Sequence, residues 1–284
     1  MAVIYERLLN FPVPEIRQSV VPKDLAFYAL SIGVGLDPTD PRQLRLVDPA
    51  SDIQAVPSMA LVLGYPGFWL GDPATGVDAV RVMHGEQELI VHHPLPPSGD
   101  VLGRTRITSL VDRGHKKGSL LTSERDIVNC SDGTVLATVR QVHVLRGDGG
   151  FGGPPAKAIS RHRVPERSPD TLVELPTRPE QALLYRLNGD MNPLHIDANV
   201  AMRAGFPRPI LHGLCTFGIV THALLRALCD YDVLRLRAVA MRFTSPVFPG
   251  DTIRTEVWHD GSFRAWALER NTIVIDNGIS SIAR

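Results

Sequence analysis

Two proline-rich corners, one in each half of the chain, resemble each other. Pro94-Leu-Pro-Pro-Ser-Gly-Asp100 and Pro246-Val-Phe-Pro-Gly-Asp251 each lead into a run that is typical of a β-strand. The glycines near their ends, Gly99 and Gly250, are separated by slightly more than half of the 284 residues. This spacing favours a duplicated fold. Because Pro-Gly-Asp turns are common in unrelated proteins, the corners alone leave duplication and chance equally open.

The order of helix-like and strand-like segments repeats as well. In the first half, residues 24–32 have helical character, and runs rich in β-branched residues follow them. In the second half, helical segments at 181–187, 199–204 and 214–228 precede another set of such runs. The expected strands span residues 86–92, 101–110, 120–128, 134–145, 238–244, 252–259, 263–269 and 272–282, with a bulge expected at Asn277-Gly278. The pattern predicts an α+β protein in which each half is a helix followed by an antiparallel sheet.

A glycine cluster separates the two halves. Residues 147–155 read Gly-Asp-Gly-Gly-Phe-Gly-Gly-Pro-Pro, and residues 161–179 are polar and dotted with prolines. This composition is typical of a long inter-domain connection. A phosphate-binding loop is disfavoured, because no Gly-Lys-Ser/Thr follows and no helix is expected directly after the cluster. We therefore divide the chain into an N-terminal half, residues 1–155, and a C-terminal half, residues 156–284.

The composition is that of a globular protein with a substantial core. Hydrophobic residues make up 44% of the chain, and 30 Lys and Arg balance 30 Asp and Glu. Since there is no long basic stripe, nucleic acid is not expected as a partner. The apolar stretch 210–220 is shorter than the roughly 20 residues of a membrane-spanning helix, so no membrane partner is expected. Three widely spaced cysteines and the absence of a signal-peptide pattern favour a cytoplasmic location.

A polar turn carries the residues best suited to chemistry. Asp190, Asn192 and His195 lie within six residues, and Pro193 disfavours helix at Asn192, so a bent loop can bring the carboxylate and the imidazole together. Such a pair suits proton transfer near neutral pH, with Asn192 orienting either member. A helix cap with a satisfied core histidine is the structural alternative, and residue types alone favour that alternative.

Three further features are candidates for binding a ligand. Gly213 begins the most apolar helix-like segment, where its N–H could polarise a carbonyl, although close packing would require a glycine equally well. The cluster His84-Gly-Glu-Gln87 precedes a strand without a metal-type spacing, which favours a structural or ligand-lining role. A basic cluster that begins at Arg113 lies in an expected hairpin, where it is either a solvated turn or a phosphate contact.

Two motifs resemble those of a known family. Tyr-Arg-Leu-Asn-Gly-Asp-Met-Asn-Pro-Leu-His-Ile-Asp, at 185–197, and Pro-Ile-Leu-His-Gly-Leu-Cys-Thr-Phe-Gly, at 209–218, are similar to the hydratase 2 signature of the MaoC-like dehydratases. The resemblance extends to Tyr28-Ala-Leu-Ser-Ile-Gly33, the His84 cluster, the glycine linker and Arg242-Phe243, and so covers nearly the whole chain. It implies a double hot-dog fold, with two antiparallel sheets each wrapped around a central helix.

The resemblance also implies a reaction and roles for the site residues. Asp190 and His195 would hold the water that adds to C3 of a trans-2-enoyl-CoA, giving a (3R)-3-hydroxyacyl-CoA, with Asn192 orienting the pair and the Gly213 N–H as oxyanion donor. Substrate-binding positions would be His84, Gly85, Arg113, where relatives often have lysine, and Phe243. No cofactor and no metal is expected, the N-terminal half would make room for the acyl chain, and the chain would form a homodimer. Three alternatives remain: a 3-hydroxyacyl-thioester dehydratase of fatty-acid elongation, an acyl-CoA thioesterase and a non-catalytic acyl-CoA binding module.

Overall fold

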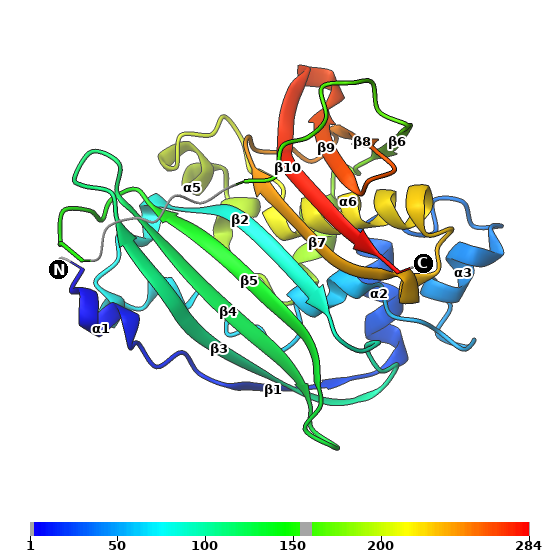
Figure 1. Ribbon diagram of the computed structural model, residues 1–284, viewed down its shortest axis with the longest axis horizontal. Helices are drawn as coiled ribbons and strands as arrows, with labels where there is room; N and C mark the ends of the chain where they lie inside the picture. The colour runs from blue at the N-terminus through cyan, green and yellow to red at the C-terminus, as the bar shows by residue number, and fades with distance from the viewer. Residues whose placement is uncertain (1–2, 154–160, 284) are drawn as a thin grey trace.

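The computed structural model describes residues 3–153 and 161–283, and Figure 1 labels their helices and strands. The helices are α1 (Tyr5–Leu9), α2 (Pro22–Ser31), α3 (Pro41–Val47), α4 (Gln181–Tyr185), α5 (Ala198–Arg203) and α6 (Gly213–Leu228). The strands are β1 (Ile16–Val20), β2 (Val82–Val91), β3 (Gly99–Asp112), β4 (Ser119–Asn129), β5 (Val135–Leu145), β6 (Thr171–Pro176), β7 (Leu236–Phe243), β8 (Thr252–Val257), β9 (Ser262–Ala267) and β10 (Thr272–Ile282).

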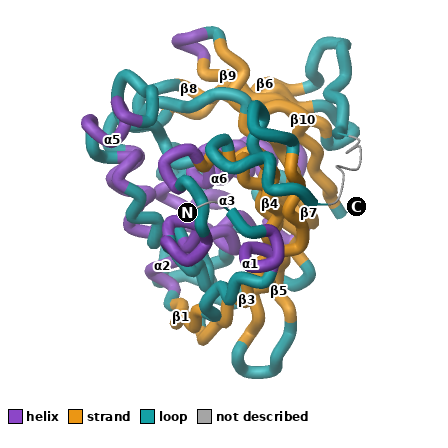
Figure 2. Tube along the Cα trace, turned by 90° about the vertical axis from the view of Figure 1, so that its left-hand side faces the viewer, coloured by secondary structure: helices purple, strands orange, loops and turns teal. Residues whose placement is uncertain are grey.

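All ten strands belong to one antiparallel sheet, in the order β1-β3-β4-β5-β2-β7-β10-β9-β8-β6. The halves meet where β2 pairs with β7, with Gln87 opposite Met241 and Leu89 opposite Val239. The two sheets expected from the sequence are therefore present as the two ends of a continuous sheet. A view from the side shows that the helices lie along one face of it (Figure 2).

The long helix α6 is the centre of the C-terminal half. Its residues from Leu214 to Leu225 are buried, because α6 packs on β6, β7 and β8 and also on the 3₁₀ helix η1 (Pro57–Leu61) from the other half. A Cβ atom added at Gly218 would lie 2.5 Å from Cγ2 of Ile32, so the chain just after α2 lies against the α6 backbone at this point. The packing of α6 thus fixes the place of its first residue, Gly213.

The N-terminal half differs in how its part of the sheet is covered. Its helix α2 contacts α3, α4 and η1, while η1 contacts the inner face of β2 and β5. The short 3₁₀ helix η1, and not a long α-helix, therefore contacts this part of the sheet. No helix in the described ranges is long and apolar enough to cross a membrane.

The structure confirms most of the predicted elements and corrects one. The expected helices and strands are present with small shifts at their ends. The bulge is present too, since the β10 register shifts between Asp276 and Ile279, and Asn277 has φ +56°. By contrast, the stretch 161–179 is not only a connection: β6 lies within it and pairs with β8 at the sheet edge. The division at residues 155 and 156 falls outside the described residues and stays a prediction.

Candidate active site

The loop between α4 and α5 places the carboxylate and the imidazole. Gly189 has φ +115°, a left-handed conformation that ends the helical turn after α4 and turns the chain toward Asp190. Asn192 then caps a 3₁₀ turn: its Oδ1 accepts the Leu194 N–H at 3.0 Å, and its own backbone N–H donates to Oδ1 of Asp190 at 3.2 Å. Asn192 therefore holds Asp190 through its backbone, while its side chain shapes the turn that carries His195.

His195 is buried and held in one tautomer. Its Nδ1 atom lies 2.8 Å from the carbonyl oxygen of Ile210, and the residue is 8% exposed. Because a carbonyl oxygen only accepts, Nδ1 carries the proton and Nε2 keeps its lone pair. Burial lowers the pKa of His195 below its usual 6.5, although the hydrogen bond to Ile210 opposes this shift. At neutral pH the ring is therefore a neutral acceptor at Nε2.

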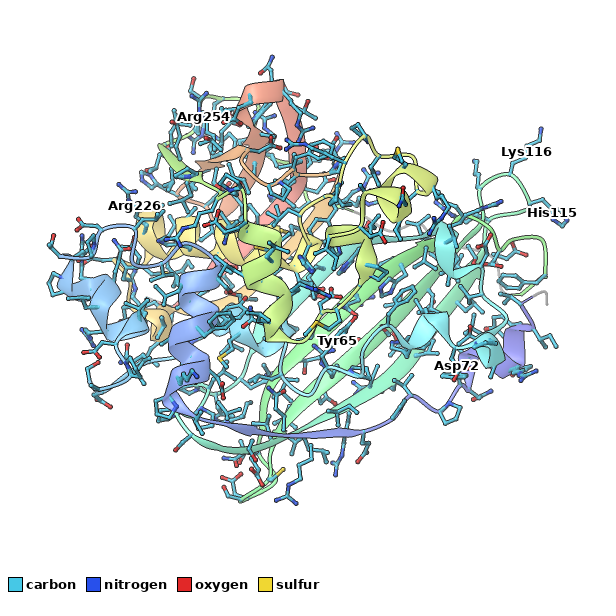
Figure 3. The ribbon with its side chains drawn as sticks, turned by 180° about the vertical axis from the view of Figure 1, so that it is seen from behind. Tyr65, Asp72, His115, Lys116, Arg226 and Arg254 are labelled. Atoms are coloured by element: carbon cyan, nitrogen blue, oxygen red, sulfur yellow. The ribbon has the colours of Figure 1, made fainter. Side chains whose placement is uncertain are left out.

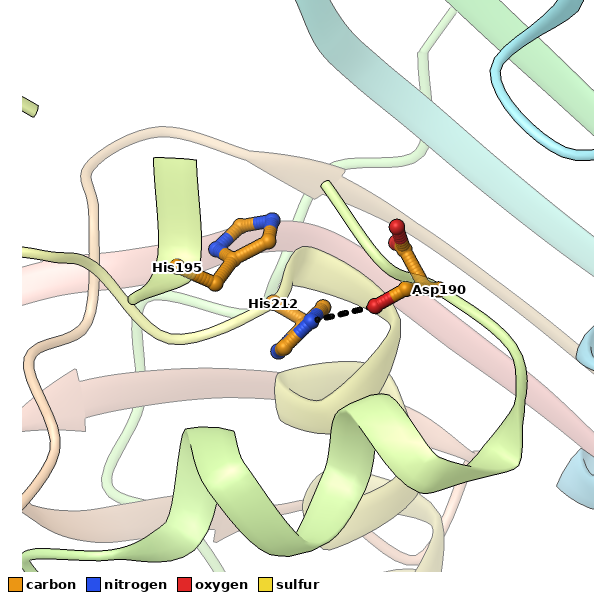
Figure 4. Close-up of side chains that lie close together, drawn as sticks. All are labelled: Asp190, His195 and His212. Carbon is orange, nitrogen blue, oxygen red and sulfur yellow. Dashed lines mark hydrogen bonds between the residues drawn. The ribbon is translucent and has the colours of Figure 1, made fainter. Parts of the chain in front are cut away.

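A second histidine, His212, stacks on the first. The two ring centroids are 3.7 Å apart, and Nε2 of His212 donates to the backbone carbonyl of Asp190 at 3.2 Å (Figure 4). Burial and, to a smaller extent, the neighbouring His195 lower the pKa of His212 to about 2, so this ring is also neutral. His212 is not among the residues predicted from the sequence, although it directly precedes Gly213 in the second motif.

Asp190, His195 and His212 form one cluster. Each offers a ligand atom, and these atoms lie within 4.8 Å of one another. Two histidines and a carboxylate are a ligand set that a metal ion can use, and the same spacing suits a small molecule such as water between acceptors. The expectation of a metal-free site stays a prediction.

Gly213 brings a backbone donor to the same place. It is the first residue of α6 and directly follows His212 of the cluster, and the N-cap His212 provides no side-chain partner for the first N–H groups of the helix. A Cβ at Gly213 would lie 3.5 Å from the Phe243 ring. The ring centroids of Phe243 and His84 are 4.8 Å apart. The structure therefore brings three of the predicted residues together: Gly213, Phe243 and His84.

The remaining predicted residues have different surroundings. Gly85 lies at the bulge in the pairing of β2 with β5, where a Cβ would meet Val144 at 3.0 Å. Arg113 is exposed in the β3–β4 hairpin and donates to the Lys117 carbonyl at 2.7 Å. Figure 3 shows this hairpin, marked by His115 and Lys116, at the edge of the molecule. Substrate contacts for both residues stay predictions.

Two tyrosines border the cluster and were not selected from the sequence. Tyr185 is fully buried, with its ring 5.2 Å from that of His212. Tyr65, from the N-terminal half, lies beside the Asp190 loop (Figure 3). Its pKa is raised first by burial and then by the negative charge of Asp190. Residue spacing carries no signal for Tyr65, since 125 positions separate it from Asp190.

Two family models account for most of this chain: the MFE-2 hydratase 2 N-terminal domain matches residues 19–147 and the MaoC like domain matches residues 161–280. The chain belongs to the MaoC-like dehydratase family. Within this MaoC-like family, it is 39% identical to the enoyl-CoA hydratase ChsH3 of Mycobacterium tuberculosis, over 92% of this chain and 91% of that protein. It is 36% identical to the peroxisomal enoyl-CoA hydratase 2 of Arabidopsis thaliana, over 94% and 92% of the two chains.

A solved structure agrees with the MaoC-like assignment. The crystal structure of the MaoC-like dehydratase from Phytophthora capsici matches this chain with a TM-score of 0.86 at 33% identity, covering 99% of both chains. Rv0216 of Mycobacterium tuberculosis, which is described as having a double hotdog fold, matches with a TM-score of 0.59 at 16% identity over 95% of this chain and 94% of that one, and this confirms the double hot-dog fold predicted from the motif.

Proposed function

We propose that this chain is a hydro-lyase that reversibly hydrates trans-2-enoyl-CoA to (3R)-3-hydroxyacyl-CoA. The observation that carries the proposal is the cluster at the start of α6: a carboxylate and a neutral Nε2, Asp190 and His195, beside the uncapped N–H of Gly213. Two relatives at 36% and 39% identity are named enoyl-CoA hydratases, which supports the same chemistry here.

The geometry suggests how the addition proceeds. Two acceptors bind the two hydrogens of one water, which leaves its oxygen lone pair free to attack C3. The oxygen–C3 bond forms as the C2–C3 double bond breaks; the pair removes one proton from the water and delivers one proton to C2. Negative charge that develops on the thioester oxygen is stabilised by the Gly213 N–H at the positive end of α6.

The alternatives use the same pair differently. A 3-hydroxyacyl-thioester dehydratase runs this reaction backwards, so the carrier, coenzyme A or acyl carrier protein, distinguishes the two roles. A thioesterase would direct the water to the carbonyl carbon and release free coenzyme A. A non-catalytic binding module would bind the thioester without turnover.

Hydration of crotonyl-CoA tests the proposal directly. Purified protein should remove the absorbance of the enoyl thioester and yield the (3R) alcohol by chiral analysis. Asp190→Asn, which keeps the shape of the side chain, should lower kcat by about 10²- to 10⁴-fold. Asp232→Asn is the matched control, because Asp232 only accepts the Leu234 N–H and an Asn oxygen does the same. Release of free thiol, or an unchanged rate for Asp190→Asn, contradicts the proposal.

Assembly and location belong to the proposal as well. We propose a homodimer, which the family resemblance supports, and a cytoplasmic location, which three cysteines that are all free support. Light scattering of the purified protein tests the dimer. Fluorescence microscopy of the tagged chain tests the location, and import into peroxisomes would contradict it.

A further inference from the structure

A polar band crosses the inner face of the N-terminal half of the sheet. The strand register places its members in neighbouring rows: His84 is opposite His143, Gln87 is opposite Gln141, and Ser123 is also opposite Gln141. Two residues further along β4 comes Arg125. An inner sheet face that packs on a core normally carries apolar side chains, so this band requires an explanation.

The band is buried and divides the apolar core. Gln87 is 1% exposed and Arg125 is 3% exposed. On one side of the band lies the main core, which includes Leu89 and Ile127. On the other side lies a small second cluster, formed mainly by leucines: Val3, Leu8, Leu70, Leu110, Leu121 and Leu145.

Several polar atoms of the band have no hydrogen-bond partner. Among the described residues these are Nε2 of His84, Nδ1 of His143 and Nε of Arg125, all buried. Leaving such atoms unpaired costs free energy, so several buried unpaired atoms within one band indicate a ligand that pairs with them. Both rings are neutral, since burial lowers the pKa of His84 to about 3 and that of His143 to about 4.

Arg125 brings a positive charge to this band. Its guanidinium lies over the Tyr65 ring, 5.3 Å from the centroid, and donates to the carbonyl of Leu61. In the described ranges it forms no ion pair, unlike Arg106 on the outer face of the same sheet, which pairs with Glu124 and Asp126. Burial lowers the pKa of Arg125 to about 10, so the group stays charged at neutral pH.

Both ends of the band reach the candidate active site. At one end, Phe243 lies between Gly213 and His84, so an acyl chain that leaves the Gly213 N–H along Phe243 meets the two histidines first. At the other end, the Arg125 guanidinium lies on Tyr65, which lies beside the Asp190 loop (Figure 3).

We infer that the acyl group of the physiological substrate ends in a carboxylate, and that Arg125 binds this carboxylate at the end of the polar band opposite His84 and His143. A guanidinium offers several N–H donors in one plane, which match the two oxygens of a carboxylate. The glutamines and histidines of the band provide hydrogen bonds to oxygen atoms along the chain, which an alkyl chain lacks. This inference rests on the proposed hydration reaction and specifies its substrate class.

The test compares enoyl-CoA substrates that end in a methyl group or in a carboxylate, at equal chain length over a series of lengths. At the best length, we expect kcat/KM to favour the carboxylate by about 10- to 100-fold, as a charge-assisted hydrogen bond does. Arg125→Met should abolish this preference, and the control Arg106→Met should keep it.

Two further measurements separate this inference from folding and from the reaction itself. Thermal unfolding should show that Arg125→Met is at least as stable as the natural protein, because the exchange removes a buried unpaired charge. If Arg125→Met does not fold, the inference is tested on the natural protein alone, by its kcat/KM for carboxylate-ended substrates compared with methyl-ended ones. An equal or better rate with methyl-ended chains at every length overturns the inference. Failure to hydrate crotonyl-CoA overturns the proposed reaction instead.

Discussion

At the scale of single residues, the site depends on a histidine that stays neutral. The pKa of His195 is lowered by burial, and its Nε2 acts as an acceptor only in the neutral form. We therefore expect kcat/KM to be constant at neutral pH and to fall only below pH 6.5, the usual value for histidine, as His195 gains a proton. A pH–rate profile with crotonyl-CoA measures this. A midpoint at or above pH 6.5 would show that burial does not control the pKa of His195.

His212 should act by positioning its neighbours. His212→Phe keeps a ring against His195 but loses the hydrogen bond to the Asp190 carbonyl. We expect kcat to fall about tenfold with little change in KM, because one ordinary hydrogen bond that holds the backbone of Asp190, and through it the place of the carboxylate, is lost. His222→Phe is the matched control, because His222 is a buried histidine within α6 that contacts Tyr231 instead. Equal losses of kcat in both variants would reduce His212 to a packing role.

The residues that could be predicted from the sequence are those close together along the chain. The spacing of Asp190, Asn192 and His195, with Pro193 between them, was sufficient to expect one turn. The spacing did not reveal that Asn192 uses its backbone N–H, because a cap depends on local geometry. Arg125 could not be selected either: Glu124, Arg125 and Asp126 are all charged, so alternation does not show which side chain faces inward.

At the scale of elements, α6 depends on close contact at its middle. Gly218→Ala should raise helix propensity by about 1 kcal/mol, yet its Cβ would lie 2.5 Å from the Ile32 side chain. We expect a net loss of about 1–3 kcal/mol in the free energy of unfolding, measured with denaturant. In an Ile32→Ala background the same exchange should cost much less. A stabilised single variant would contradict this packing.

Strong sequence patterns explain which elements were predicted. The apolar residues of α6 are visible because the helix is buried from Leu214 to Leu225, and the long strands are visible because each has one mainly buried face. By contrast, β1 and β6 are short edge strands in which alternate residues are at least partly exposed, so their sequences are close to those of loops.

At the scale of the whole molecule, the two halves share one core. The β2–β7 pair joins the sheets, and α6 of one half packs on η1 of the other. We expect a single cooperative unfolding transition, and we expect residues 1–153 and 161–284 not to fold when expressed separately, because β2 and β7 would become exposed edges. Circular dichroism and calorimetry check this, with co-expression of both pieces as the control. Two transitions, or native spectra from one piece, would show independent domains.

The second apolar cluster has a consequence for motion. Because the polar band separates Leu110, Leu121 and Leu145 from the main core, few apolar contacts couple this end of the sheet to the rest. Regions with few such contacts open before the whole protein unfolds. We expect amide hydrogens at this end of β3, β4 and β5 to exchange with solvent sooner than those around Ile127.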